Sequence, residues 1–269
     1  SRFHITMPEQ VPPSVSRSFE ALTPTLLVML LIGSITYFLG FNWSGAITAI
    51  VTPLVTATDT LPGVLLVCFL TCFFWFFGIH GASIVGSIAR PLWLTLLEQN
   101  ANAAASGVAG TALPAIGPEP FYQWFIWIGG AGCTIGLAIL LVSVCKSKYL
   151  KDLGRICVAP ALFNINEPLM FGAPVVLNLT LAIPFVLTPM ICAIIAWVAT
   201  SLGLVSRVII TAPWTLPGPI GAYLATGGDW RAAVLCCILI AVSAVCYLPF
   251  VKIYDKQFLA QEQVEEPQE

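Results

Sequence analysis

Charge is what this sequence lacks most. Only 9% of its 269 residues are charged, with 11 basic and 13 acidic side chains, whereas 58% are hydrophobic. An average soluble domain carries about 25% charged residues, so this chain has too few to cover a surface in water. Its hydrophobicity excludes a disordered chain, and a net charge of -2 creates no field that attracts a nucleic-acid backbone. An integral membrane protein remains.

Charge is wholly absent from six stretches: 21–58, 60–89, 120–145, 168–206, 208–228 and 232–251. A helix needs about 20 apolar residues to cross a bilayer, and the stretches lack the alternation that is typical of β-barrels. The fold class predicted is an all-α integral membrane protein with about five spans and two or three re-entrant or broken hairpins. The spans are expected near 22–40, 61–77, 122–145, 175–201 and 232–251.

The remaining segments are expected to leave the bilayer or to enter it only partly. We expect a half-inserted helix at 42–58, re-entrant hairpins at 78–97 and 157–172, a loop at 98–118 and a Pro/Gly-broken segment at 207–228. Trp124 and Trp127 suggest an aromatic belt. Four basic residues lie within 146–155, and Lys252 and Lys256 follow the last span, so the positive-inside rule places both regions in the cytoplasm.

Nine cysteines lie in or beside apolar runs. A disulfide framework is typical of short secreted chains, so we interpret these cysteines as small buried hydrophobic residues. No His, Cys or carboxylate pair shows the spacing of a metal site. Neither a metal nor another cofactor is expected.

Glu167 is the most unusual acidic residue. Five other acidic residues lie between 21 and 251, at expected span ends or loops where water solvates them, namely Asp59, Glu98, Glu119, Asp152 and Asp229. Glu167 instead follows Asn164 and Asn166 and precedes a proline, in a broken helix tip between apolar residues. An ionisable group at membrane depth indicates a functional site, and broken helices form such sites in transporters. The alternative is a carboxylate that caps a helix or pairs with a base.

His80 and two tryptophans complete the candidate site. His80 lies between Gly78 and Gly81, which permit close backbone approach. Trp75 and Trp214 lie in or beside broken segments. A sugar presents hydroxyls and apolar C–H faces, so a site of Asn, Glu, His and aromatic rings suits it. The alternatives are a core histidine and core or interfacial tryptophans.

Four segments resemble a known family. Residues 163–174, Phe-Asn-Ile-Asn-Glu-Pro-Leu-Met-Phe-Gly-Ala-Pro, are similar to the signature of enzyme IIC, the permease component of the lactose/cellobiose/diacetylchitobiose family of the sugar phosphotransferase system. Residues 78–81, 213–222 and 226–231 match further stretches in the same order. The chain resembles the C-terminal, substrate-binding part of these longer proteins.

The resemblance implies a mechanism and partners. A disaccharide would bind from outside, and cytoplasmic enzyme IIB would transfer phosphate from a phosphocysteine to its 6-hydroxyl. Glu167 would act as the base and His80 would orient the hydroxyl, both being the catalytic candidates. Trp75 and Trp214 would stack on the sugar, and we add Asn164 and Asn166 as hydrogen-bond partners.

The resemblance also implies a multi-pass protein of the bacterial cell membrane, in contact with lipid, that forms a homodimer through N-terminal spans absent from this chain. The expected organisation is a connector at 1–20, a first span and interfacial helix at 21–58, a substrate-binding domain at 59–255 and a cytoplasmic tail at 256–269. Within this tail, the polar and acidic residues 261–269 are expected to be disordered. Two alternatives stay open: an ion-coupled sugar symporter, which also uses broken helices and a buried carboxylate, and an inactive fragment.

Overall fold

The computed structural model describes residues 22–42, 52–173 and 175–265. The chain divides into two units, Ser1–Pro53 and Leu54–Glu269. The first unit contains the apolar helix α2 (Leu22–Leu39), whose bounds agree with the first expected span. Most of the helix expected at 42–58 lies outside the described residues, although Thr52–Thr58 is helical and meets the next helix at an 80° bend.

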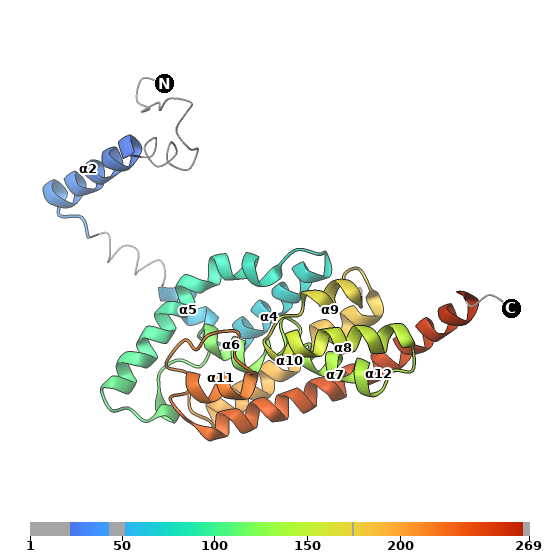
Figure 1. The fold of residues 1–269 in the computed structure, drawn as a ribbon. Coiled ribbons are helices and arrows are strands. Elements are labelled where there is room, and N and C mark those ends of the chain that lie inside the picture. The colour runs from blue at the N-terminus through green and yellow to red at the C-terminus, as the bar shows by residue number, and fades with distance from the viewer. Residues whose placement is uncertain (1–21, 43–51, 174, 266–269) are drawn as a thin grey trace. The chain divides into compact units, whose positions relative to one another are not determined.

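Every regular element described in the second unit is a helix (Figure 1). In chain order these are α4 (Leu61–Phe76), α5 (Gly81–Ala105), the 3-10 helix η1 (Gly110–Ala112), α6 (Glu119–Phe125), α7 (Ile135–Ser143), α8 (Lys148–Leu162), α9 (Glu167–Gly172), α10 (Leu179–Ser201), α11 (Gly218–Ala225) and α12 (Trp230–Glu265).

Polar caps fix where several of these helices begin. The side chains of Thr60 and Ser147 accept hydrogen bonds from backbone N–H groups of Gly63 and Leu150, at the starts of α4 and α8. Asn178 does the same for the first turn of α10. Such caps satisfy N–H groups that have no partner within the helix. In a chain with long apolar stretches, these capping residues determine where each helix begins, which hydrophobic composition alone does not.

Helix α12 runs along the second unit (Figure 1) and packs against α7, α10 and α11, while α4 packs against α10 and α5. A buried hydrophobic cluster lies between these helices and joins Trp75 of α4, Met170 of α9, Phe185 of α10 and Tyr247 of α12. All nine cysteines are free, seven of them buried, in keeping with their interpretation as apolar side chains. The short helix α9 is thus packed in a core to which α4, α10 and α12 all contribute.

Within the described residues, two helices, α10 and α12, are long and apolar enough to cross a membrane, and a third span is added if the bent pair formed by 52–58 and α4 counts as one. They coincide with the spans expected at 175–201 and 232–251. The all-helical class is confirmed, but the expected number of about five spans is not.

The span expected at 122–145 is wrong as a continuous helix, because it is broken into α6, an irregular segment and α7. Gly129, Gly130, Gly132 and Cys133 all have positive φ angles there, a conformation that ends a right-handed helix. Trp124 and Trp127 are buried, so the aromatic belt predicted from them is wrong as well.

The boundaries predicted at 78–118 also need correction. The turn after α4 is short, and α5 then continues through Pro91 as one helix of 25 residues. Residues 98–105, expected as loop, form its last turns because they are rich in alanine, the strongest helix former. Gly107, with φ of +87°, follows the end of the helix, where a left-handed residue is common.

The C-terminal end of α12 meets the start of α8. The carboxylate of Asp255 accepts hydrogen bonds from the N–H groups of Lys146 and Ser147 at 2.9 Å each. Glu262 accepts from the Ser147 hydroxyl at 2.6 Å and from the Tyr149 N–H at 3.1 Å. These contacts keep α12 helical to Glu265, so the disordered tail predicted from 261 onward is wrong for 261–265. The basic segment and the C-terminal helix lie at the same end of the unit.

Candidate functional site

A cavity of about 300 Å³ lies between α4, α5, α6, α9 and the segments that connect α4 to α5, α6 to α7, α8 to α9 and α10 to α11. All six residues singled out in the sequence line it, namely Trp75, His80, Asn164, Asn166, Glu167 and Trp214. Its other lining residues are Ala82, Arg90, Trp93, Glu119, Gln123, Trp127, Gly130 and Ala131. The volume is at the lower end of the range for small-molecule pockets, about 300–1,000 Å³.

Glu167 and His80 face each other in this cavity. The distance from His80 Nε2 to Glu167 Oε1 is 3.8 Å, and the side chains are 49% and 47% exposed, respectively. The separation exceeds a direct hydrogen bond but leaves room for a ligand hydroxyl to contact both groups. About half of the Glu167 side chain is exposed, so the protein alone does not shield this carboxylate from water.

The backbone turn between α4 and α5 fixes the orientation of His80. Its Nδ1 accepts a hydrogen bond from the Ser83 N–H at 3.2 Å, which makes His80 the cap of α5. A neutral imidazole that accepts at Nδ1 carries its proton on Nε2, the atom that faces Glu167. A Cβ on Gly81 would lie 1.9 Å from the Thr71 carbonyl oxygen. The close approach that Gly81 permits is therefore to α4.

Asn164 connects three segments at the tip before α9. Its Oδ1 accepts from the Gly129 N–H at 2.9 Å, and its Nδ2 donates to the carbonyls of Trp214 and Leu216 at 2.8 and 3.0 Å. Its φ is +61°, a conformation that asparagine tolerates better than most residues. Asn164 thereby holds the tip against the loop that carries Trp214.

Asn166 holds the same tip against the irregular segment between α6 and α7. Its Nδ2 donates to the Ala131 carbonyl at 2.8 Å and contacts the Thr134 hydroxyl at 3.2 Å. A Cβ on Gly130 would lie 2.4 Å from the Asn166 side chain, so only glycine permits this contact. An amide has two N–H donors, and in both asparagines these are already bound to protein. Only the side-chain oxygens could be offered to a sugar.

The two predicted stacking residues differ in environment. Trp75 is 3% exposed, belongs to the core cluster, and lies 4.6 Å from the His80 ring and 6.5 Å from the Phe171 ring between centroids. Trp214 is 55% exposed and lies on the loop before α11. Trp214 can therefore cover a ligand face with most of its ring, whereas Trp75 can offer only an edge of its surface.

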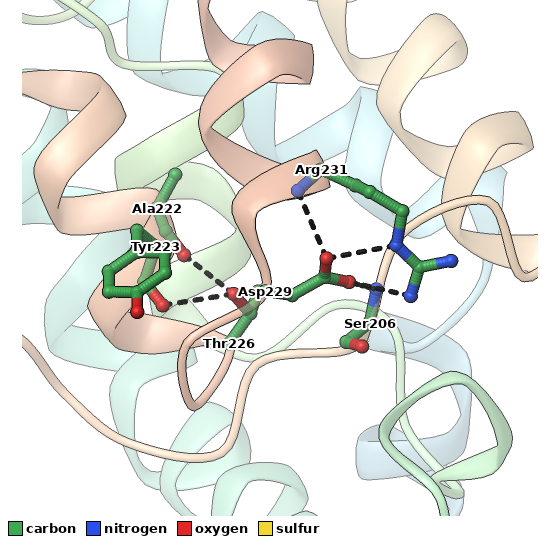
Figure 2. A network of polar contacts seen from close by, with 6 residues as sticks. All are labelled: Ser206, Ala222, Tyr223, Thr226, Asp229 and Arg231. Carbon is green, nitrogen blue, oxygen red and sulfur yellow. Dashed lines mark hydrogen bonds and ion pairs between the residues drawn. The ribbon is translucent and has the colours of Figure 1, made fainter.

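A second polar network fixes the start of the loop that carries Trp214 (Figure 2). The Asp229 carboxylate accepts from the Ser206 N–H at 2.8 Å and from the Arg231 guanidinium at 2.9 Å. Burial opposes ionisation of Asp229, but these donors outweigh it and lower its pKa below the usual value. The Thr226 hydroxyl donates to the Ala222 carbonyl at 2.8 Å nearby, at the end of α11.

The sequence reading missed an ion pair in the cavity. Both Nε and Nη2 of Arg90 donate to Glu119 Oε1, at 3.1 and 3.0 Å. Glu119 was expected at a span end or loop that water solvates, but it begins α6 after a segment whose Ile116 and Gly117 N–H groups donate to Asp59. Asp59, Glu119 and Asp229 thus all have protein partners. An arginine inside an otherwise uncharged run was the available signal for Arg90.

The cavity combines two carboxylates, an imidazole, a guanidinium and indole rings. Among the described residues, no group of three or more His, Cys, Asp or Glu side chains could hold a metal ion. Polar groups that fix orientation, set among aromatic walls, suit an uncharged ligand with many hydroxyls.

Comparisons with known proteins agree with this chemistry. Residues 1–189 match the family model described as "Phosphotransferase system, EIIC". The chain is 39% identical over 262 residues to the lichenan permease IIC component of Bacillus subtilis (strain 168), covering 95% of this chain and 57% of the relative. It is 36% identical over 263 residues to the lactose-specific EIICB component of Streptococcus mutans serotype c, and the match covers 96% of this chain and 46% of that relative.

A solved structure is similar over the same region. The crystal structure of the IIC component from the N,N'-diacetylchitobiose-specific phosphotransferase system superposes with a TM-score of 0.86 at 36% identity, covering 97% of this chain and 61% of that chain. The chain spans less than two thirds of the length of each of these proteins.

Proposed function

The chain belongs to the phosphotransferase system EIIC family, and from this premise we propose that it is the substrate-binding part of a sugar permease of the bacterial cell membrane. The permease would bind a disaccharide and pass it to the cytoplasm as it is phosphorylated. The observation that carries the proposal is that Glu167, His80 and Trp214, from three distant segments, line one cavity. A structural role for each residue separately would not require that they meet.

The substrate class that we propose is a disaccharide of the cellobiose, lactose or diacetylchitobiose type. Relatives with lichenan, lactose and diacetylchitobiose in their names support this range. The cavity supports it too, because Trp214 offers an apolar face and Arg90, Glu119 and Gln123 offer polar groups in the same cavity as Glu167. Discrimination within the class would depend on how these polar groups meet individual hydroxyls.

In the proposed reaction, the 6-hydroxyl of the sugar lies between His80 and Glu167. The Glu167 carboxylate takes the hydroxyl proton, the hydroxyl oxygen forms a bond to phosphorus, and the bond from phosphorus to the phosphocysteine of enzyme IIB breaks. His80 Nε2 donates to the hydroxyl and orients it. A bound sugar would also displace water from Glu167, which strengthens its action as a base. Asn164 and Asn166 contribute by holding the tip.

The partner that we propose is cytoplasmic enzyme IIB, and the S. mutans relative named EIICB supports it. The basic residues of α8 and the end of α12 lie together, which supports a shared cytoplasmic side by the positive-inside rule. We also propose a homodimer whose contacts lie largely in the part of the relatives that this chain does not cover.

Glu167→Gln in the complete permease tests the mechanism. The variant keeps the size of the side chain but loses the base, so sugar binding should stay within about tenfold while sugar phosphate formation falls roughly 10²–10⁴-fold. Glu98→Gln is the matched control, because Glu98 is exposed on α5 and does not line the cavity. Binding is measured on purified protein, and sugar phosphate with enzyme IIB and its phosphoryl donor.

Two outcomes would refute parts of this proposal. Normal phosphorylation in the Gln variant would exclude the general base, and loss of binding and turnover together would favour a purely structural carboxylate. Uptake of unmodified sugar that depends on an ion gradient and not on the phosphoryl donor would instead establish the symporter alternative.

A further inference from the structure

The end of α9 opposite Glu167 is held by two tyrosine hydroxyls from other helices. Tyr149 of α8 donates to the Gly172 carbonyl at 2.8 Å, and Tyr254 of α12 donates to the Ala173 carbonyl at 3.1 Å. The last carbonyls of a helix have no partner within it. The contact made by Tyr254 is buried, where a carbonyl left without a donor would cost free energy, whereas the contact made by Tyr149 lies on the exposed side of the same end. Together the two tyrosines hold this end of α9.

The two tyrosines are joined by a third aromatic ring. Tyr149 stacks on Phe258, with centroids 5.3 Å apart and planes at 8°, and Tyr254 meets the edge of Phe258 at 4.9 Å. We name Tyr149, Tyr254 and Phe258 the tyrosine clamp. The Tyr149 N–H also donates to Glu262, which fixes the start of α8 to α12 beside the clamp.

Helix α9 is short enough for its far end to set the position of Glu167. It has 6 residues, which corresponds to a rise of about 9 Å, and Glu167 is the first of them. Leu169 and Met170 pack in the core, and Phe171 meets Trp75 in the cavity wall. A short, packed helix moves as one piece, so a shift at Gly172 displaces Glu167 by a similar distance.

Given the proposed function, we propose that Tyr149 and Tyr254 are positioning residues for Glu167. Their hydroxyls fix the far end of α9 and so hold the carboxylate where it can take the proton from the sugar hydroxyl. A small misplacement of a catalytic group lowers the rate of the chemical step more than it lowers substrate binding. The clamp would therefore affect phosphorylation through Glu167, although neither tyrosine lines the cavity.

The test removes single hydroxyls and compares two backgrounds. In the complete permease, Tyr149→Phe and Tyr254→Phe should each lower the rate of sugar phosphorylation about fivefold to tenfold, the scale of one lost hydrogen bond. Sugar affinity should change less than about twofold if the hydroxyl acts only on the chemical step. In the Glu167→Gln background the same substitutions should have no further effect, because the group that they position is gone.

Tyr223→Phe is the matched control, because this exposed tyrosine lies on α11 away from α9 and its variant should match the parent protein. Equal losses with and without the Glu167 carboxylate would show a general structural effect and overturn the proposal, as would unchanged rates in both clamp variants. If Tyr254→Phe, whose ring is 4% exposed, fails to fold, Tyr149→Phe at 48% exposure decides alone. A fully active Glu167→Gln variant would refute the proposed mechanism itself.

Discussion

Asn164 offers a sharp test of how the site is built. It has three side-chain hydrogen bonds and a φ of +61°, so substitutions can separate hydrogen bonding from backbone conformation. Asn164→Ala removes the hydrogen bonds and leaves a Cβ in the left-handed region. Asn164→Gly removes the same hydrogen bonds but accepts that conformation without strain.

The magnitudes follow from these contacts. Three lost hydrogen bonds at about 0.5–1.5 kcal/mol each give roughly 2–4 kcal/mol of destabilisation in both variants. The left-handed conformation costs alanine about 1–2 kcal/mol, whereas the extra freedom of glycine in the unfolded chain costs it about 0.4–1 kcal/mol. Alanine should therefore be less stable than glycine by about 0.5–1 kcal/mol, the reverse of the order at an ordinary helical position.

The assay is thermal unfolding of the purified permease, with sugar affinity measured on the same samples. The shift in unfolding temperature per kcal/mol falls as a protein grows, so in the longer permease both variants should unfold several degrees below the parent, and alanine below glycine. Sugar affinity should fall with them, since the Trp214 loop loses its attachment. Asn102→Ala, at an exposed asparagine of α5, should leave both quantities unchanged.

The reasoning fails if alanine proves as stable as glycine, since the backbone strain would then be absent. It also fails if both variants match the parent in stability, because the hydrogen bonds would then contribute nothing. Normal stability with strongly reduced sugar affinity would assign Asn164 to direct sugar contact and would contradict the scaffold role.

Three further predictions follow from the same structure. Trp214→Ala should weaken sugar binding by about 1–3 kcal/mol with little change in stability. Trp75→Ala should weaken binding as well and should also destabilise the fold by about 3–5 kcal/mol. If sugar titration shows unchanged affinity in both variants, stacking is excluded. Cysteines placed at Lys148 and Lys256 should react with an impermeant thiol reagent only from the cytoplasmic side, with the labelling of the native cysteines subtracted as background. Labelling of these positions from outside intact cells would show that the orientation is the opposite one. Folding lowers the pKa of Asp229, so its ionised carboxylate stabilises the folded protein fully above the unfolded pKa near 3.8, and this stabilisation is lost as the pH falls. The difference in unfolding temperature between the parent and Asp229→Asn should therefore narrow on acidification. A constant difference would contradict the ion pair.

The sequence by itself determined the class of the protein and the identity of its unusual residues. Scarce charge and long apolar runs identified helices that suit a membrane, and α10 and α12 appear close to the expected ranges. Glu167 and His80 could be recognised because polar residues are costly between apolar runs. These inferences succeed because they depend on local composition, which the sequence displays directly.

Only the tertiary structure decided which residues meet and what each polar group is already bound to. The pairing of Arg90 with Glu119 spans 29 positions, and nothing in either segment specifies the other. The sequence suggested that the amides of Asn164 and Asn166 are hydrogen-bond partners of the sugar. In the structure, their N–H groups instead donate to backbone carbonyls of loops far away in the chain. The break between α6 and α7 likewise depends on positive φ angles at Gly130 and Cys133. Local composition fixes the cost of burying a polar group, whereas the partner that offsets this cost is chosen by packing between segments far apart in the chain.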